Sequence, residues 1–102
     1  MGKIHAFDED DARIYGLHAA ILLSHIRQEI SMNQARKEYS HDEKVWARIS
    51  VKQLAKFYKF FTEKQVRYIL DGLVAAGVLV RGNFNATKFD RTLWYTYGPR
   101  HT

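Results

Sequence analysis

The strongest structural signals in the sequence mark the two ends of one helix in its second half. Thr62 is followed by Gln65 at the spacing of a capping box, in which the threonine hydroxyl and the glutamine side chain satisfy free backbone N–H groups at a helix start. Phe61 and Val66 stand on either side of this cap at the spacing of a hydrophobic staple, which fixes the angle at which the chain enters the helix. Gly77 would end the helix, since glycine takes the left-handed conformation that a C-terminal cap needs. A helix fixed at both ends limits how the neighbouring segments can be placed.

This predicted helix, residues 62 to 76, has an apolar face and a polar face. Apolar residues recur at helical spacing on the face expected to meet the core: Val66, Ile69, Leu70 and Leu73. The opposite face carries charged and polar side chains: Lys64, Arg67, Tyr68 and Asp71. We therefore expect one side of the helix to be buried and the other to be exposed.

A similar start signal lies one helix earlier. Ser50 and Gln53 have the spacing of a second capping box, and Ile49 and Leu54 form its staple pair. The link between the two helices, residues 59 to 61 (Lys-Phe-Phe), is so short that the chain must turn sharply. The two helices are therefore predicted to form a helix-turn-helix.

The sequence after this pair predicts a β-hairpin with a basic tip. Residues 78 to 80 (Val-Leu-Val) and the alternating run over residues 93 to 97 (Leu-Trp-Tyr-Thr-Tyr) are typical of strands. Between them lie residues that favour turns: Gly82, Asn83 and Asn85. The same segment carries three basic residues: Arg81, Lys88 and Arg91.

A long helix is expected near the N-terminus. Acidic residues 8 to 11 cluster where it would begin, which suits the positive end of the helix dipole. Apolar residues then recur at helical spacing from about Asp11 to about Glu29. This apolar face is wide enough to fill the core and to leave surplus surface, such as Leu23 with Ile30, that could support a homodimer.

The segment between this helix and the helix pair divides in two. Residues 31 to 44 are polar and poorly periodic, which predicts a loop or an irregular helical turn. Residues 45 to 49 (Val-Trp-Ala-Arg-Ile) predict a short strand that pairs with the hairpin. The order of elements is that of a winged helix-turn-helix, an α+β fold with three main helices, a small three-stranded antiparallel sheet and a β-hairpin wing.

A single domain is expected from length and composition. At 102 residues, of which 46% are hydrophobic, the chain can bury a modest core and is not expected to be disordered. We divide it into a flexible lead-in over residues 1 to 10, a winged-helix domain over residues 11 to 98 and a tail over residues 99 to 102.

The positive charge of the chain is unevenly distributed. The formal net charge is +5, and residues 50 to 91 hold eight lysines and arginines against three acids. Residues 1 to 49 hold seven basic residues against eight acids. The excess therefore lies on the predicted helix-turn-helix and wing, where a nucleic-acid partner would be contacted through its phosphates.

The sequence argues against several classes of function. Without cysteine there is no disulfide, thiolate chemistry or zinc finger, which suits a reducing cytoplasmic setting. The N-terminal residues lack the apolar run of a signal peptide, and polar residues interrupt the apolar patch of the first helix, so no membrane partner is expected. No P-loop, HExxH, nucleophile elbow or dinucleotide-binding glycine pattern is present, so we expect neither an enzyme nor a cofactor. His18 and His25 lack a third ligand at metal spacing, and core or surface histidines are the preferred interpretation.

Double-stranded DNA is the expected partner, with the helix at residues 62 to 76 in the major groove and the hairpin at the backbone or minor groove. The candidate contacts are Lys52, Lys56, Thr62, Lys64, Gln65, Arg67, Tyr68, Arg81, Lys88 and Arg91. Lys52, Lys56 and Lys59 could bind phosphates or could only keep their helix soluble. Because lysine is a point charge, these residues would position the DNA rather than specify its sequence.

Other residues of the hairpin have structural interpretations. Asn83, Asn85 and Asp90 are expected to shape the turn, and Arg91 could pair with Asp90 instead of with DNA. The aromatic side chains at residues 94 to 97 could stack on single-stranded bases. Aromatics at strand spacing more often pack in a core or on a sheet, and we prefer that interpretation.

Residues 62 to 97 resemble the winged-helix domain at the N-terminus of phage and plasmid replication-initiation proteins, including the DnaD-like replisome organisers. The runs Gly-Asn-Phe-Asn (82 to 85) and Asp-Arg-Thr-Leu-Trp-Tyr-Thr (90 to 96) match the hairpin pattern of that family. The segment YGLHAAILLSHI and the strand around Trp46 also lie where the family has them, so the resemblance covers roughly residues 11 to 97. It implies origin or operator DNA binding by a mobile-element protein, with replication proteins as further partners.

The sequence therefore predicts sequence-selective binding of double-stranded DNA in the replication initiation or control of a phage or plasmid. A small transcriptional repressor or excisionase-like factor is an alternative role for the same chemistry. A winged helix that serves protein interaction or dimerisation without DNA is an alternative of another class. Salt distinguishes the two classes, because phosphate binding weakens steeply with ionic strength whereas apolar docking does not.

Overall fold

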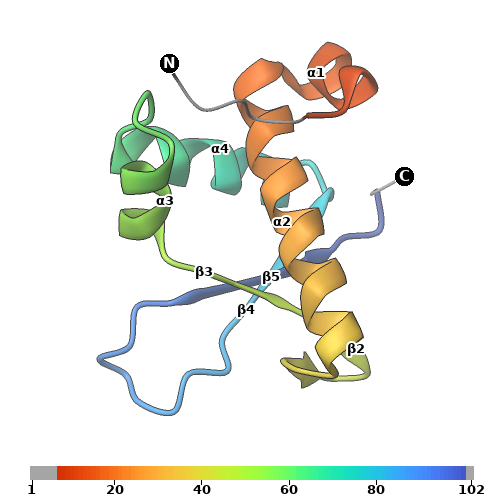
Figure 1. Ribbon diagram of the computed structural model, residues 1–102, viewed down its shortest axis with the longest axis vertical. Helices are drawn as coiled ribbons and strands as arrows, with labels where there is room; N and C mark the ends of the chain where they lie inside the picture. The colour runs from red at the N-terminus through yellow and green to blue at the C-terminus, as the bar shows by residue number, and fades with distance from the viewer. Residues whose placement is uncertain (1–6, 101–102) are drawn as a thin grey trace.

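A computed structural model describes residues 7–100, and within this range the chain forms an α+β fold of four helices and two small antiparallel sheets (Figure 1). The helices are α1 (Glu9–Tyr15), α2 (Leu17–Arg36), α3 (Val51–Phe57) and α4 (Glu63–Ala75). The strands are β1 (Ser40–His41), β2 (Lys44–Val45), β3 (Ala47–Ile49), β4 (Leu79–Gly82) and β5 (Leu93–Tyr97). The α+β class predicted from the sequence is thus confirmed. Among residues 7–100, no helix is long and apolar enough to cross a membrane.

The helix α2 crosses over the three-stranded sheet, and α3 and α4 lie together beside it (Figure 1). The loop between β4 and β5 extends away from the helices (Figure 1). Of the predicted lead-in, residues 1 to 6 lie outside the described residues, and α1 already begins at Glu9. Of the predicted tail, residues 101 and 102 lie outside them.

The prediction of one helix from about Asp11 to about Glu29 was wrong, because two helices occupy this region. Gly16 has a φ of +92°, a conformation that side chains rarely adopt, and it separates α1 from α2. Asp8 caps α1 by accepting a hydrogen bond from the Asp11 backbone N–H at 3.0 Å. The side chain of Asp11 is buried and pairs with Arg27, which holds α1 against α2.

The prediction of a loop or an irregular helical turn over residues 31 to 44 was also wrong. The helix α2 continues to Arg36 and is ended by Lys37 in the left-handed conformation, with a φ of 57°. A tight β1–β2 hairpin follows, in which Asp42 and Glu43 both have positive φ, as the favoured two-residue hairpin turn requires. Buried Asn33 joins the end of α2 to the sheet, since its Nδ2 donates to the Trp46 carbonyl oxygen at 2.9 Å.

The three-stranded sheet has the order β3-β5-β4, and both pairs are antiparallel. Tyr95 of the central strand lies between Ala47 of β3 and Arg81 of β4. This confirms the predicted sheet formed by the segment near residue 47 and the hairpin. Its first strand begins at Ala47 rather than Val45, because Val45 belongs to β2 and pairs with Ser40.

Both ends of α4 follow the sequence signals. The hydroxyl of Thr62 accepts from the Gln65 backbone N–H at 3.1 Å, and the Gln65 side chain accepts from the Thr62 N–H at 2.8 Å. At the other end Gly77 has a φ of +78°, and the N–H of Val78 donates to the Leu73 carbonyl oxygen at 3.0 Å. This is the hydrogen-bond pattern of a glycine-capped helix, so the predicted helix boundaries are confirmed.

The core is formed where α2 and α4 pack on the central strand. Leu22, Leu23 and Ile26 of α2, Leu70 of α4 and Tyr95 of β5 are fully buried. Leu23 and Ile30, which were suggested as surplus surface for a homodimer, are both buried in this core.

Candidate nucleic-acid interface

Three basic side chains from three separate elements line one hollow on the surface. They are Lys52 of α3, Arg67 of α4 and Arg91 of the β4–β5 loop, and the hollow has a volume of about 300 Å³. All three side chains are exposed, and none of them forms a salt bridge with another residue of the range 7–100. The fold thus brings together cations that are far apart in the sequence and leaves their charges open to an anionic partner.

The hollow also contains two carboxylates, Glu63 and Asp90. Glu63 lies in the first turn of α4, where the positive end of the helix dipole stabilises a negative charge. The carboxylate of Asp90 accepts a hydrogen bond from the Thr92 backbone N–H at 2.9 Å, and this bond holds the pKa of Asp90 below its usual value. Asp90 therefore serves the loop itself, as the sequence predicted.

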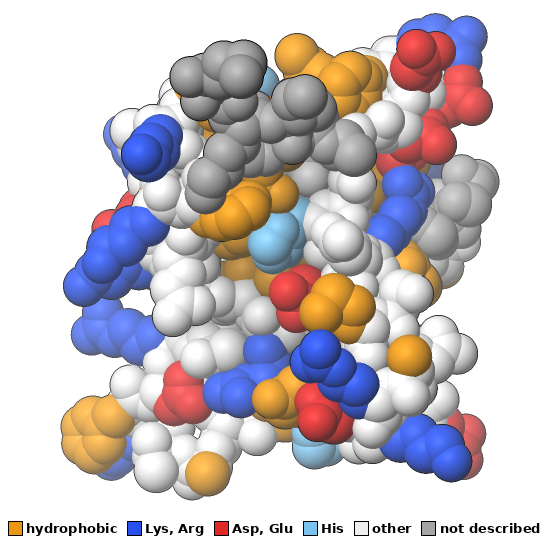
Figure 2. All heavy atoms as spheres, in the orientation of Figure 1, with side chains coloured by type: hydrophobic (Ala, Val, Ile, Leu, Met, Phe, Trp, Pro, Cys, Tyr) orange, Lys and Arg blue, Asp and Glu red, His pale blue; other side chains and the backbone are white. Residues whose placement is uncertain are grey.

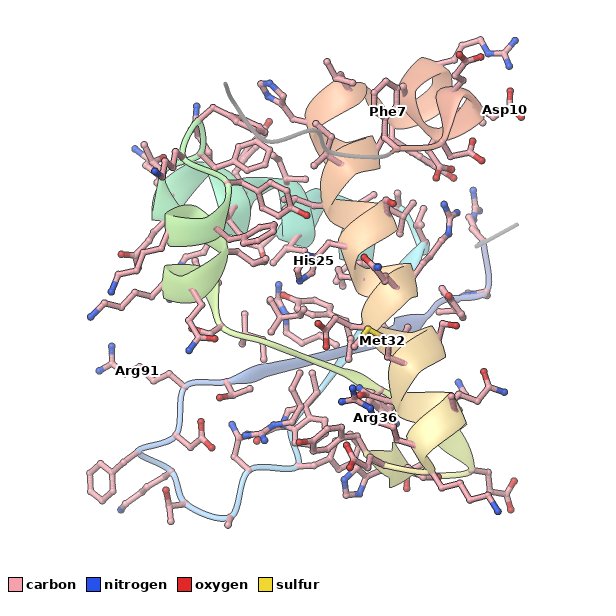
Figure 3. The ribbon with its side chains drawn as sticks, viewed as in Figure 1. Phe7, Asp10, His25, Met32, Arg36 and Arg91 are labelled. Atoms are coloured by element: carbon pink, nitrogen blue, oxygen red, sulfur yellow. The ribbon has the colours of Figure 1, made fainter. Side chains whose placement is uncertain are left out.

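The alternative pairing of Arg91 with Asp90 is not found among residues 7–100. Asp90 instead lies 3.8 Å from Arg48 of β3, whose guanidinium lies over the Trp94 ring at 5.2 Å. Arg91 is consequently free to face the hollow. Figure 3 shows Arg91 projecting from the chain below α3, on the opposite side of the molecule from the end of α2.

The remaining candidates on α4 divide into two groups. The Thr62 hydroxyl and the Gln65 side-chain oxygen both accept hydrogen bonds in the capping box, so these residues hold the helix start. Lys64 and Tyr68 lie on the outer face, where Tyr68 is 80% exposed. Lys64 is three residues before Arg67, so the two cations are neighbours on the helix surface.

Lys64, Gln65 and Tyr68 also line a second, more apolar groove between α4 and the junction of α1 with α2. This groove has a volume of about 600 Å³ and contains Leu17 and His18. The outer face of α4 is therefore charged toward the β4–β5 loop and apolar toward α1.

Two further candidates are exposed lysines outside the hollow, Lys56 in the last turn of α3 and Lys88 in the β4–β5 loop. Figure 2 shows Lys and Arg side chains gathered along the left edge of this face, from α3 toward the loop. Basic side chains thus gather along one edge of this view.

Arg81 differs from the other candidates because it is engaged within the protein. Its guanidinium donates to the Tyr95 hydroxyl at 2.8 Å and pairs with Asp71 of α4. Partial burial lowers the pKa of Arg81, but the hydrogen bonds to Asp71 and Tyr95 outweigh this effect and raise it overall. These contacts tie the hairpin to α4, so Arg81 fixes the position of the loop relative to the helix.

The base of the loop is held by Asn85 and a cluster of aromatic rings. The side chain of Asn85 donates to the carbonyl oxygens of Asp90 and Thr92 at 3.0 and 2.8 Å and accepts from Trp94 Nε1 at 2.7 Å. Buried Trp94 and Tyr95 confirm the preferred interpretation that the strand aromatics pack in the structure.

Two contributors to this cluster were missed from the sequence. The rings of His41 and Phe84 stack at 4.2 Å, and Phe84 also contacts Trp46 edge-on at 4.9 Å. Phe84 lies within the hairpin motif and could have been noticed there. His41 carried no signal, because its segment was interpreted as a loop.

His25 and His18 both contact aromatic side chains of the protein. His25 Nδ1 lies 3.0 Å from the Tyr58 hydroxyl, and burial lowers the pKa of His25 although Glu29 opposes the shift. His18 packs edge-on against Phe61 at 5.2 Å. No group of three potential metal ligands occurs within the described part of the chain.

The site is defined by its geometry alone. Comparison with protein-family models, curated proteins and solved structures finds no match for this chain.

Proposed function

We propose that the chain is a winged helix-turn-helix that binds double-stranded DNA. In this proposal α4 enters the major groove, α3 contacts the backbone, and the β4–β5 loop is the wing. The observation that carries the proposal is the hollow at which Lys52, Arg67 and Arg91 converge, since none of the three forms a salt bridge within residues 7–100 and they outnumber the two carboxylates there. A phosphate group placed there would meet cations from all three elements at once.

Affinity and selectivity would come from different side chains. Lys52, Lys56 and Lys88 would neutralise phosphates and release counterions, which makes binding strong at low salt but independent of sequence. Lys64, Arg67 and Tyr68 on the exposed face of α4 would lie nearest to phosphates and base edges. Lys64 and Arg67 would add to the salt dependence, and the contacts that this face makes to base edges would provide selectivity.

For the biological role, we propose replication initiation or its control in a phage or plasmid, on the basis of the sequence resemblance over residues 11 to 97. A transcriptional repressor would use the same contacts. The second candidate, a protein-docking module, is favoured by one observation, the apolar groove between α4 and the α1–α2 junction with exposed Leu17 at its edge.

The test is a fluorescence-anisotropy titration against random duplex and single-stranded DNA at about 50 and 200 mM salt. We expect duplex binding that weakens by at least about tenfold between these concentrations, because several phosphates are neutralised. The triple variant Lys52→Ala/Arg67→Ala/Arg91→Ala should reduce the slope of log affinity against log salt by about three, one for each lost contact.

Arg36→Ala is the matched control, since Arg36 is exposed at the end of α2 and does not line the hollow (Figure 3). It should leave the salt slope close to the wild-type value. Absence of duplex binding at low salt, or equal effects of the triple variant and the control, would overturn the proposal and favour protein docking.

A further inference from the structure

The tip of the β4–β5 loop is a turn that displays an aromatic ring. The Asp90 N–H donates to the Thr87 carbonyl oxygen at 3.3 Å, which places Lys88 and Phe89 at the two central positions of a four-residue turn. Phe89 is 84% exposed, more than any other large hydrophobic side chain of the described residues. Turn positions normally carry small or polar residues, so a phenylalanine this exposed needs an explanation.

The turn has a fixed backbone around it. Asn85 holds the carbonyl oxygens on both sides of Arg91, and the Asp90 carboxylate binds the Thr92 N–H. Asn85 is in turn held by buried Trp94. The base of the loop is therefore ordered before a partner arrives, and the Phe89 ring projects from a supported position. It makes no ring contact within residues 7–100.

We propose that Phe89 is a wedge that enters the minor groove and inserts its ring at a base step. This inference rests on the proposed function. It adds a contact whose strength depends on how easily the DNA is kinked rather than on its charge. Apolar side chains inserted between bases partly unstack them and kink the duplex, and the bent DNA then contacts more protein.

Charge identifies DNA as the occupant rather than an apolar protein surface. Lys88 precedes the ring and Arg91 follows it by two residues, and both are exposed. The one carboxylate between them, Asp90, is engaged by Thr92 and Arg48. An apolar ring between cations matches the minor groove, where phosphates flank the stacked bases.

The experiment uses a random-sequence duplex in which 2-aminopurine replaces some adenines, because this base fluoresces more strongly when it is unstacked. Wild-type protein should bind the duplex and raise the fluorescence. Phe89→Ala should bind about tenfold more weakly, which lies toward the lower end of the affinity losses expected when one base–aromatic contact is removed. It should raise the fluorescence little and keep the wild-type salt slope.

Two matched variants separate the wedge from the charge. Phe89→Leu keeps an apolar wedge and should retain most of the fluorescence rise. Lys88→Ala should reduce the salt slope by about one and leave the fluorescence rise in place. The midpoint of urea unfolding should be the same for all variants, because both side chains are exposed.

The outcomes distinguish the wedge from the proposed function. If wild-type protein binds duplex DNA and Phe89→Ala matches it in affinity and fluorescence, the wedge is overturned while DNA binding stands. If wild-type protein does not bind duplex DNA, both proposals fail. Vesicles that contain phosphatidylserine test the other anionic surface. If wild-type protein binds these vesicles, and Phe89→Ala loses that binding but keeps wild-type affinity for duplex DNA, the ring contacts a lipid surface and the wedge is overturned.

Discussion

Asp11 of α1 and Arg27 of α2 form an ion pair in which the carboxylate side chain is only 8% exposed. The pair joins two helices that Gly16 separates, and the residues are sixteen positions apart. Because Gly16 breaks the helix, α1 needs a side-chain contact to stay on α2. Asp11 also lies in the first turn of α1, where the positive end of the helix dipole stabilises its negative charge.

We therefore expect Asp11→Ala to lower the free energy of unfolding by about 1 to 3 kcal/mol, since it removes the buried carboxylate that accepts hydrogen bonds from the Arg27 guanidinium. Urea unfolding followed by tryptophan fluorescence measures the change. The control is Asp10→Ala, which removes an exposed pair with Arg13 and should have no measurable effect. Equal stability of wild type and Asp11→Ala would show that the pair does not hold α1 in place.

Features encoded by neighbouring residues were predictable from the sequence. The caps at Thr62 and Ser50 depend on residues three positions away, and the structure shows both hydroxyls accepting the expected N–H groups. The reciprocal side-chain bond of a full capping box is shown for Thr62 and Gln65 and not, within residues 7–100, for Ser50 and Gln53. Gly77 ends α4 because glycine removes the cost of positive φ. The three-stranded sheet followed from alternating residues and turn signals.

Features that depend on distant contacts or on costly conformations were not predictable. Lys37, Asp42 and Glu43 adopt positive φ without being glycine, so neither the end of α2 nor the β1–β2 turn was marked in the sequence. In the candidate site, the cations of the hollow were each identified from the sequence. That Arg81 is instead engaged by Asp71 and Tyr95 depends on strand pairing and helix packing, which only the fold supplies.

The outer face of α4 gives a direct test of DNA recognition. Lys64→Ala combined with Arg67→Ala should weaken duplex binding and reduce the salt slope by about two, because both cations would contact DNA. Both side chains are exposed, so the urea midpoint should not change. Anisotropy at two salt concentrations provides the measurement, and unchanged affinity in the double variant would rule out α4 as the recognition helix.

Arg81 should affect stability more than the salt dependence of binding. Arg81→Gln removes hydrogen bonds to Tyr95 and Asp71, and we expect a loss of about 0.5 to 1.5 kcal/mol of unfolding free energy for each bond. If its role is to position the hairpin, the salt slope for duplex binding stays at the wild-type value. A slope reduced by about one would instead identify Arg81 as a phosphate contact.

Gly98 allows the end of β5 to approach the start of β4. A Cβ at this position would lie 2.3 Å from the Gly77 carbonyl oxygen, and the Gly98 N–H donates to the Val78 carbonyl oxygen at 2.8 Å. Gly98→Ala should force the backbones apart and lower the free energy of unfolding by roughly 1 to 3 kcal/mol. The matched control is Gly72→Ala on α4, where an added Cβ would meet nothing within 4 Å. This substitution should stabilise the helix by about 0.5 to 1 kcal/mol, because alanine favours a helix more than glycine does. Similar urea midpoints for both variants would contradict the close approach.

The burial of His25 makes stability depend on pH. Burial lowers the pKa of His25 from its ordinary value of 6.5, and the nearby Glu29 only opposes this shift. The unfolded chain therefore binds a proton at His25 more readily than the folded chain does, so stability falls as pH drops below about 6.5. Above that pH both states hold the imidazole neutral, and its contribution is constant.

The variant His25→Gln removes this titration and keeps a side chain that can hydrogen-bond to the Tyr58 hydroxyl. Urea unfolding at about pH 7 and about pH 5 should show a smaller loss of stability for the variant than for wild-type protein. The carboxylates that titrate at lower pH are present in both proteins, so their effect cancels in the difference. Parallel changes in the two proteins would mean that His25 accepts a proton as easily in the folded state as in the unfolded chain, and that its burial does not resist protonation.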